Sequence, residues 1–178
     1  MSAYLIVTAV GRDRPGLVDL LARELKSREL NIETSRMSLL GGEFAMLLLI
    51  SGDEEAVAAI VADPSPLAAA AGLDVFARRT HAPGARSGPR ALPYRIATAG
   101  MDHPGIVHDI ASVLHGFQVS VETMDTRVTR AANSGTPIFH MEARLAVPVE
   151  VRLKSLREAL EELEDRLNMD VELVALDD

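Results

Sequence analysis

The sequence contains no cysteine and no tryptophan, and aromatic residues make up only 3% of its 178 residues. The lack of cysteine excludes disulfide bonds, thiolate metal sites and cysteine nucleophiles. With so few aromatic residues, a hydrophobic core has to be built from aliphatic side chains. No uncharged apolar run is long enough to span a bilayer, and the N-terminus lacks the basic flank and cleavage pattern of a signal peptide. We therefore expect a cytoplasmic protein without membrane association.

Clusters of basic residues are also missing, and the formal net charge is −8. Proteins that contact nucleic acid directly hold its phosphates with grouped lysines and arginines. Here the arginines near the middle of the chain, Arg78, Arg79, Arg86 and Arg90, are scattered. Direct binding of nucleic acid is therefore not expected. Hydrophobic residues at 48% and charged residues at 25% are typical of a globular protein.

One short segment occurs twice. Residues 11–18 read Gly-Arg-Asp-Arg-Pro-Gly-Leu-Val, and residues 100–107 read Gly-Met-Asp-His-Pro-Gly-Ile-Val, at an offset of 89 residues. The same offset relates residues 30–34 to residues 119–123. A fixed period indicates that one structural unit is used twice.

The repeat predicts two domains joined by a linker. The first domain is expected over residues 1–80 and the second over residues 93–178. Residues 81–92 contain little apolar content and several prolines and glycines, which favours a linker.

Each unit predicts the element order β-α-β-β-α-β. In the first unit a β-rich run at residues 4–10 precedes the repeated segment, and leucines at helical spacing follow it. Two strands joined at Gly41-Gly42 come next, then a second helix and a closing strand. With right-handed crossovers this order gives an α+β fold of two ferredoxin-like units, each an antiparallel sheet with helices on one face.

Three helix starts are expected from capping patterns. Asp13 is a candidate N-cap, because its carboxylate can accept a backbone N–H of the first turn. Ser51 and Glu54 have capping-box spacing. Pro148 is expected to open the last helix.

The third strands of the two units differ. Residues 138–147 alternate apolar and polar side chains, which is typical of a sheet with one solvated face. Residues 44–50 are apolar on both faces, since Ala45, Leu47 and Leu49 lie opposite the core positions. We therefore expect the helix-free face of the first sheet to be buried against another sheet or another chain, and the protein to be a homo-oligomer.

The repeated turn has the features of an anion site. Pro15 suits a first helical turn, and Gly16 lacks a Cβ, so that a ligand or a backbone can approach closely. Unpaired amides and the positive end of a helix dipole attract anions. A purely structural turn without a ligand stays open as an alternative, because duplication copies structural turns too.

Two βαββαβ units, each with Asp-x-Pro-Gly before its first helix, resemble tandem ACT domains over nearly the whole chain. The two-unit layout resembles the glycine cleavage system transcriptional repressor family. The resemblance implies that an amino acid, glycine or a close relative, binds between the turn and strand 2, often where two domains meet, with its carboxylate on the turn amides. The ligand-binding residues that it implies are Asp13, Arg14, Pro15, Gly16, Leu17 and Asn31 in the first unit, and Asp102, His103, Gly105, Ile106 and Ser120 in the second. Ser120 stands where Asn31 does and has a shorter reach.

The resemblance also implies a function. Members of the repressor family act through a DNA-binding activator, which agrees with the acidic charge found here. A non-enzymatic transcriptional repressor in glycine or one-carbon metabolism is implied, with a LysR-type activator as the candidate protein partner. The alternatives are a stand-alone ACT module that controls a metabolic enzyme in trans, the regulatory part of an enzyme such as formyltetrahydrofolate deformylase, and a structural module without a ligand.

No catalytic residues, cofactor or metal are expected. His103, His108 and His115 do not have the i, i+4 spacing of paired histidine ligands. His103 lies beside the turn, however, and a histidine can carry a proton near neutral pH.

Overall fold

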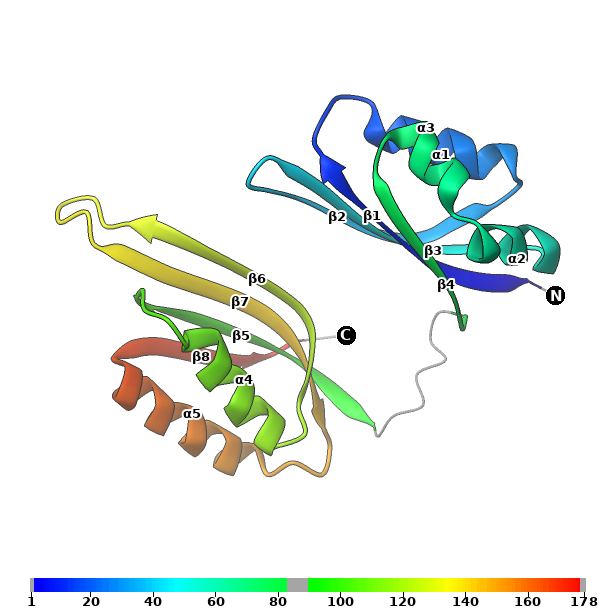
Figure 1. The fold of residues 1–178 in the computed structure, drawn as a ribbon. Coiled ribbons are helices and arrows are strands. Elements are labelled where there is room, and N and C mark those ends of the chain that lie inside the picture. Colours follow the sequence, from blue (N-terminus) through cyan, green and yellow to red (C-terminus); the bar gives the residue numbers. More distant parts are fainter. Residues whose placement is uncertain (1, 83–89, 177–178) are drawn as a thin grey trace. The chain divides into compact units, whose positions relative to one another are not determined.

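The computed structural model describes residues 2–82 and 90–176 (Figure 1). The chain divides into two compact units, residues 1–86 and 87–178. Most of the predicted linker, residues 83–89, lies outside the described residues.

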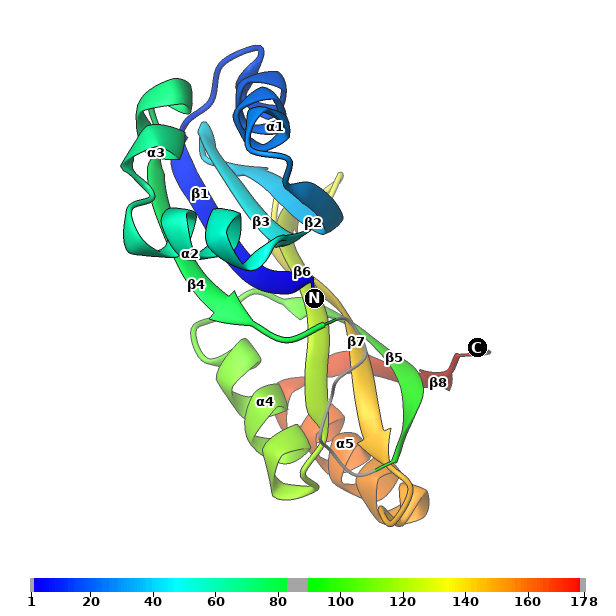
Figure 2. The ribbon, with the colours of Figure 1, turned by 90° about the vertical axis from the view of Figure 1, so that its right-hand side faces the viewer.

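The first unit is a four-stranded antiparallel sheet with helices on one face (Figures 1 and 2). In chain order its elements are β1 (Ala3–Arg12), α1 (Leu17–Ser27), β2 (Asn31–Leu40), β3 (Glu43–Gly52), α2 (Glu54–Ala62), α3 (Ser65–Ala71) and β4 (Asp74–Thr80). The strand order is β2-β3-β1-β4, so that β1 and β3 are central and β2 and β4 form the edges.

The second unit repeats this architecture. Its elements are β5 (Ala91–Met101), α4 (Ile106–Gly116), β6 (Ser120–Arg130), β7 (Pro137–Pro148), α5 (Leu153–Leu167) and β8 (Met169–Ala175). The strand order β6-β7-β5-β8 matches that of the first sheet. The predicted α+β fold of two ferredoxin-like units is confirmed.

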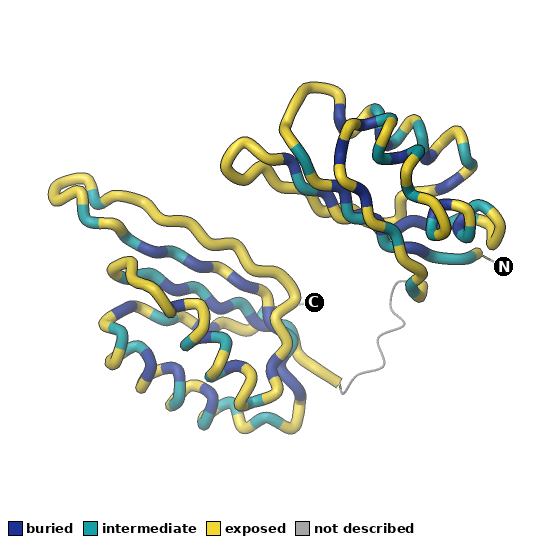
Figure 3. Tube along the Cα trace, viewed as in Figure 1, coloured by how far each residue is buried: buried dark blue, intermediate teal, exposed yellow. Residues whose placement is uncertain are grey.

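Each unit buries its own core between its sheet and its helices. Central strands bury every second side chain, as Leu5, Val7 and Ala9 do in β1, whereas β2 and β6 are exposed along their whole length (Figure 3). The core is largely aliphatic, as expected, and burying one leucine stabilises the fold by about 2 kcal/mol relative to leaving it in water. Aromatic side chains enter the two cores at Phe44, Tyr94 and Phe139.

Two of the expected helix starts are wrong. Asp53 caps α2, because its carboxylate accepts a hydrogen bond from the Ala56 N–H at 2.9 Å. Ser51 instead lies in β3, since that strand pairs with β1 as far as Gly52. Pro148 is the last residue of β7, and α5 begins after Arg152. In both cases strand pairing includes the residue that the local pattern favoured as a helix start.

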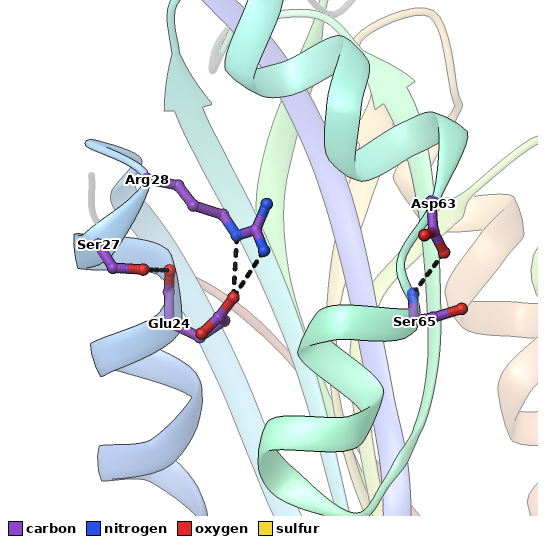
Figure 4. Close-up of polar contacts among 5 residues, drawn as sticks. All are labelled: Glu24, Ser27, Arg28, Asp63 and Ser65. Carbon is purple, nitrogen blue, oxygen red and sulfur yellow. Dashed lines mark hydrogen bonds and ion pairs between the residues drawn. The ribbon is translucent and has the colours of Figure 1, made fainter.

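Polar contacts define the end of α1 and the break between α2 and α3 (Figure 4). The Arg28 guanidinium donates to the Glu24 carboxylate at 2.7 and 3.0 Å, and the Ser27 hydroxyl donates to the Glu24 carbonyl at 2.8 Å. Asp63 accepts a hydrogen bond from the Ser65 N–H at 3.0 Å. Hydrogen bonds from Ser65 lower the pKa of Asp63 below its ordinary value, and the charge of Arg28 adds to this shift.

The helix-free faces of the two sheets differ in chemistry. Paired residues of neighbouring strands share a face, so the register of β1, β3 and β4 defines an apolar face on the first sheet. Leu47 is 45% exposed on this face and Phe76 is 73% exposed. Burial of this face against another sheet or chain stays a prediction. Its apolar members are Ile6, Val10, Ala45, Leu47, Leu49 and Phe76.

Candidate functional site

The corner between β1 and α1 is shaped by a glycine in the left-handed conformation. Gly16 is the N-cap of α1, with φ 94° and ψ −1°, and no side chain caps the helix. The expected cap by Asp13 is therefore wrong. Gly105 repeats this arrangement at the start of α4, with φ 102° and ψ −13°. Both glycines are needed for their conformation, because other L-residues rarely adopt it.

The left-handed N-cap leaves backbone donors at the corner. The Gly16 carbonyl accepts the first helical hydrogen bond, from the Leu20 N–H at 3.0 Å. The N–H groups of the residues between them have no partner within the helix, and they carry the positive end of its dipole. A Cβ placed on Gly16 or Gly105 would meet nothing within 4 Å. Each corner therefore presents amides to an anion in open space.

Two contacts hold the first corner in place. The Asp13 N–H donates to the Gly42 carbonyl at 3.2 Å, which ties the corner to the β2–β3 hairpin. The Arg14 guanidinium donates to the Ala71 carbonyl at 2.9 Å. This places a positive charge at the C-terminal end of α3, where the helix dipole favours it. Arg14 thus has a structural contact besides its predicted role with a ligand.

The second corner lacks that arginine. The Asp102 N–H donates to the Pro137 carbonyl at 3.0 Å, in the manner of Asp13. His103 takes the place of Arg14, and its Nδ1 atom lies 3.1 Å from the carbonyl oxygen of Pro104. The turn residues of both corners, including Pro15, are exposed to solvent.

The residues after the two glycines point inward. The side chains of Leu17 and Ile106 are each 2% exposed and belong to the cores of their units. At these two predicted site positions the side chain is therefore not accessible to a ligand.

Asn31 does not lie beside the corner of its own unit. Asn31 pairs with Ser51, and Ser51 pairs with Tyr4 at the beginning of β1, whereas the corner follows Arg12. Eight residues of strand separate Tyr4 from Arg12, which is a distance of about 26 Å. Helix α1 runs back along the sheet before β2 begins, and this places the start of β2 at the far end.

The second unit shows the same separation. Ser120 pairs with Ala146, which pairs with Pro93, and the corner follows Met101. In neither unit does the structure bring the corner and the first residue of the edge strand together.

Asn31 belongs to a small polar cluster that the sequence analysis missed. The Asn31 side-chain amide donates to the Glu33 carboxylate at 3.0 Å, and the Ser51 hydroxyl donates to the same oxygen at 2.5 Å. The register of β2 against β3 shifts at this point, between Ile32 and Thr34. The sequence repeat could have pointed to Glu33, because Glu122 occupies the same position in the second unit. The strand register shifts at Glu122 as well.

Among residues 2–82 and 90–176, no group of three or more histidine, aspartate or glutamate side chains is arranged to hold a metal ion. In the same part of the chain, every helix is too short or too polar to cross a membrane.

Residues 3–78 match the family model of the ACT domain. This first unit is an ACT domain. The second unit repeats the strand order and the glycine corner of the matched unit.

The whole chain is similar to the glycine cleavage system transcriptional repressors of Escherichia coli (strain K12) and Shigella flexneri. It is 27% identical to each over 165 residues, and the alignment covers 93% of this chain and 86% of the relative.

Two solved structures have the same fold over the whole chain. A protein from Galdieria sulphuraria, described as unknown, superposes with a TM-score of 0.84 at 28% identity, covering 99% of this chain and 100% of the other. A protein provisionally designated a glycine cleavage system transcriptional repressor superposes with a TM-score of 0.69 at 22% identity, covering 100% and 99%.

We predict that Glu33 titrates below the ordinary glutamate value of 4.5, because hydrogen bonds from Ser51 and, to a smaller extent, Asn31 stabilise its carboxylate and lower its pKa. Ser51→Ala should raise the pKa of Glu33, and Asn31→Ala should raise it less. Since the lowered pKa belongs to the folded state, this contribution to stability is present above the unfolded pKa and is lost as the pH falls through the folded one. Carboxyl ¹³C NMR measures the titration.

Ser38→Ala is the matched control, because Ser38 lies exposed on the same strand. An unchanged Glu33 pKa in Ser51→Ala would show that the hydrogen bond does not form in solution.

Proposed function

We propose that this tandem ACT-domain protein is a non-enzymatic sensor of a small amino acid, glycine or a close relative, and that it represses transcription through a DNA-binding protein partner. The observation that supports this most strongly is the pair of uncapped glycine corners. The ligand carboxylate would accept hydrogen bonds from the first-turn amides of α1 or α4, where charge-assisted bonds are about twice as strong as neutral ones.

The polar head of the ligand needs further contacts, and the position of Asn31 restricts where they come from. Asn31 can both donate and accept hydrogen bonds, but it lies about 26 Å along the sheet from the corner of its own unit. It can complete a corner only when the start of β2 of one ACT unit reaches the corner of another. A homo-oligomer fits this requirement. Ser120 would play the corresponding part with a shorter side chain.

A protein partner accounts for repression without direct contact with DNA. The net charge of −8 disfavours phosphate binding, whereas the relative in Escherichia coli is named a transcriptional repressor. We propose that the partner is a LysR-type activator in the cytoplasm. Ligand binding would alter the affinity for that partner if the ligand binds the free and the partner-bound states unequally.

Calorimetry with glycine, alanine and serine tests the sensor proposal. The wild-type protein should bind at least one of them, and Gly16→Val or Gly105→Val should abolish binding at the altered corner. A valine there places a branched side chain in front of the amides. Because φ is 94° or 102°, the substitution also costs about 1–2 kcal/mol of stability, so unfolding is followed in parallel.

Gly116→Val is the matched control. Gly116 lies at the end of α4 with open space around it and no positive φ, so this variant should bind as the wild type does. Unchanged amino-acid binding in both folded corner variants would refute the corners as the site. If none of the three amino acids binds to the wild type, the result would support a structural module without a ligand.

Co-purification from the native cytoplasm, with and without glycine, separates the two regulatory proposals. A LysR-type regulator that is retained in only one of the two conditions supports transcriptional control. Glycine-dependent retention of a metabolic enzyme instead supports a stand-alone ACT module that acts on an enzyme in trans. If the same partner is retained equally with and without glycine, the result contradicts ligand-controlled partner binding.

A further inference from the structure

The helix-free face of the second sheet is hollowed and charged. Two adjoining hollows, of about 280 and 450 Å³, lie over its central strands. They share Arg127 and Glu142 in their walls, so they form one trough along the sheet. We call this feature the charged trough, and its principal members are Ala97, Ala99, Asp125, Arg127, His140 and Glu142.

Small residues on the central strand form the floor of the trough. In the register of the sheet, Ala97 lies between Glu142 of β7 and Glu172 of β8. Ala99 lies in the same way between His140 and Asp170. Longer side chains therefore rise on both sides of a floor of two methyl groups.

In the first unit, larger side chains occupy the positions that form the floor of the trough. The residues at the repeat positions of Ala97 and Ala99 are Thr8 and Val10, and Thr8 pairs with Leu47 on one side and Phe76 on the other. The two sheets share a fold, and this face is where their chemistry diverged. The trough is therefore not a consequence of the fold itself.

The charges of the trough lie in rows across the strands. One row contains Asp125 and Glu142, which pair directly and share the open face. The next row contains Arg127, paired with His140. The rows are two residues apart along the strands, a spacing of about 6.6 Å. Two carboxylates directly opposite each other repel, and a cation between them would remove this repulsion.

The nearby arginines do not supply that cation. Arg95 forms an ion pair with Glu172 at 2.9 Å, and Arg144 forms one with Glu122 at 3.1 Å. Arg127 takes part in no ion pair or hydrogen bond with the rest of residues 2–82 and 90–176. Among the described residues, the trough thus presents a guanidinium without an ion pair in one row and two carboxylates without an ion pair in the next.

We propose that the charged trough binds a small zwitterion that is longer than an α-amino acid. Its carboxylate would pair with the Arg127 guanidinium, and its ammonium group would lie between Asp125 and Glu142. Charge-assisted hydrogen bonds at both ends give such a ligand an orientation. The spacing of the rows favours a dipeptide or an amino acid with separated charges over glycine. This site is independent of the glycine corners.

An NMR titration with glycylglycine at low ionic strength tests the proposal. Backbone amides of residues 97–99 and 140–142 should shift and saturate. Glycylglycinamide keeps only the ammonium group and N-acetylglycylglycine keeps only the carboxylate, so each should bind at least about tenfold more weakly, as expected when one charge-assisted contact is lost.

Two variants and one control locate the ligand. Arg127→Gln should weaken glycylglycine binding about tenfold or more. The double substitution Ala97→Thr with Ala99→Val installs the first unit's residues on the floor and should abolish binding, while threonine and valine suit a strand and preserve folding. Arg166→Gln makes the same charge change at an exposed position of α5 and should leave binding unchanged.

Three results would overturn the proposal. The first is the absence of shifts at about 50 mM glycylglycine, well above a millimolar Kd. The second is equal binding of the zwitterion and its single-charge analogues. The third is saturable shifts at Gly105 and Ile106 in place of the trough, which would assign the ligand to the corner.

Discussion

A positive φ at one glycine determines what each corner can do. Because Gly16 and Gly105 begin their helices in the left-handed conformation, the chain leaves the strand and enters the helix without a side chain folding back over the first turn. An aspartate or serine cap would have satisfied those amides from within. The corner instead keeps its donors, and the hydrogen bond from Arg14 to the Ala71 carbonyl ties the corner to the end of α3. In the proposed function, recognition of a carboxylate would therefore follow from a backbone conformation and would need no dedicated side chain.

Comparison of the two repeated units distinguishes the residues that the fold requires from those that differ between the units. A Cβ on Gly100 would lie 2.4 Å from the Met169 Cβ and 3.0 Å from its Cα, so glycine is needed there for β5 and β8 to approach. A Cβ on Gly11 would meet only the end of the Leu73 side chain, at 2.8 Å. The corner glycine is likewise shared. The helix-free faces are not constrained in this way, and they differ: the central strands β1 and β3 present mainly apolar side chains on one, and the other carries charges in rows. Two sheets with one topology can therefore present different surfaces to different molecules.

Much of the fold could be predicted from periodicity, because the repeat sets the two units and the alternation of β7 sets its buried face. Single residues at element ends could not, since β1 pairs as far as Arg12, past its expected end at residue 10, and Gly16 in place of Asp13 is the N-cap of α1. The corner was predicted from its motif, but the place of Asn31 was not. Helix α1 has 11 residues and therefore a length of about 16 Å, and only its direction along the sheet shows that β2 starts at the far end. The contact of Glu33 with Ser51 and the rows of the trough depend on strand register, which one sequence does not reveal.

The central claim is that a small carboxylate binds to bare backbone amides at a glycine corner. The most direct measurement is a ¹H–¹⁵N NMR titration with glycine that follows the amides of Leu17 and Val18 in the first corner and of Ile106 and Val107 in the second. The account predicts saturable downfield shifts of these amides in at least one corner, as expected for N–H groups that gain a charged acceptor. Glycine binding that leaves all four amide signals in place would contradict it.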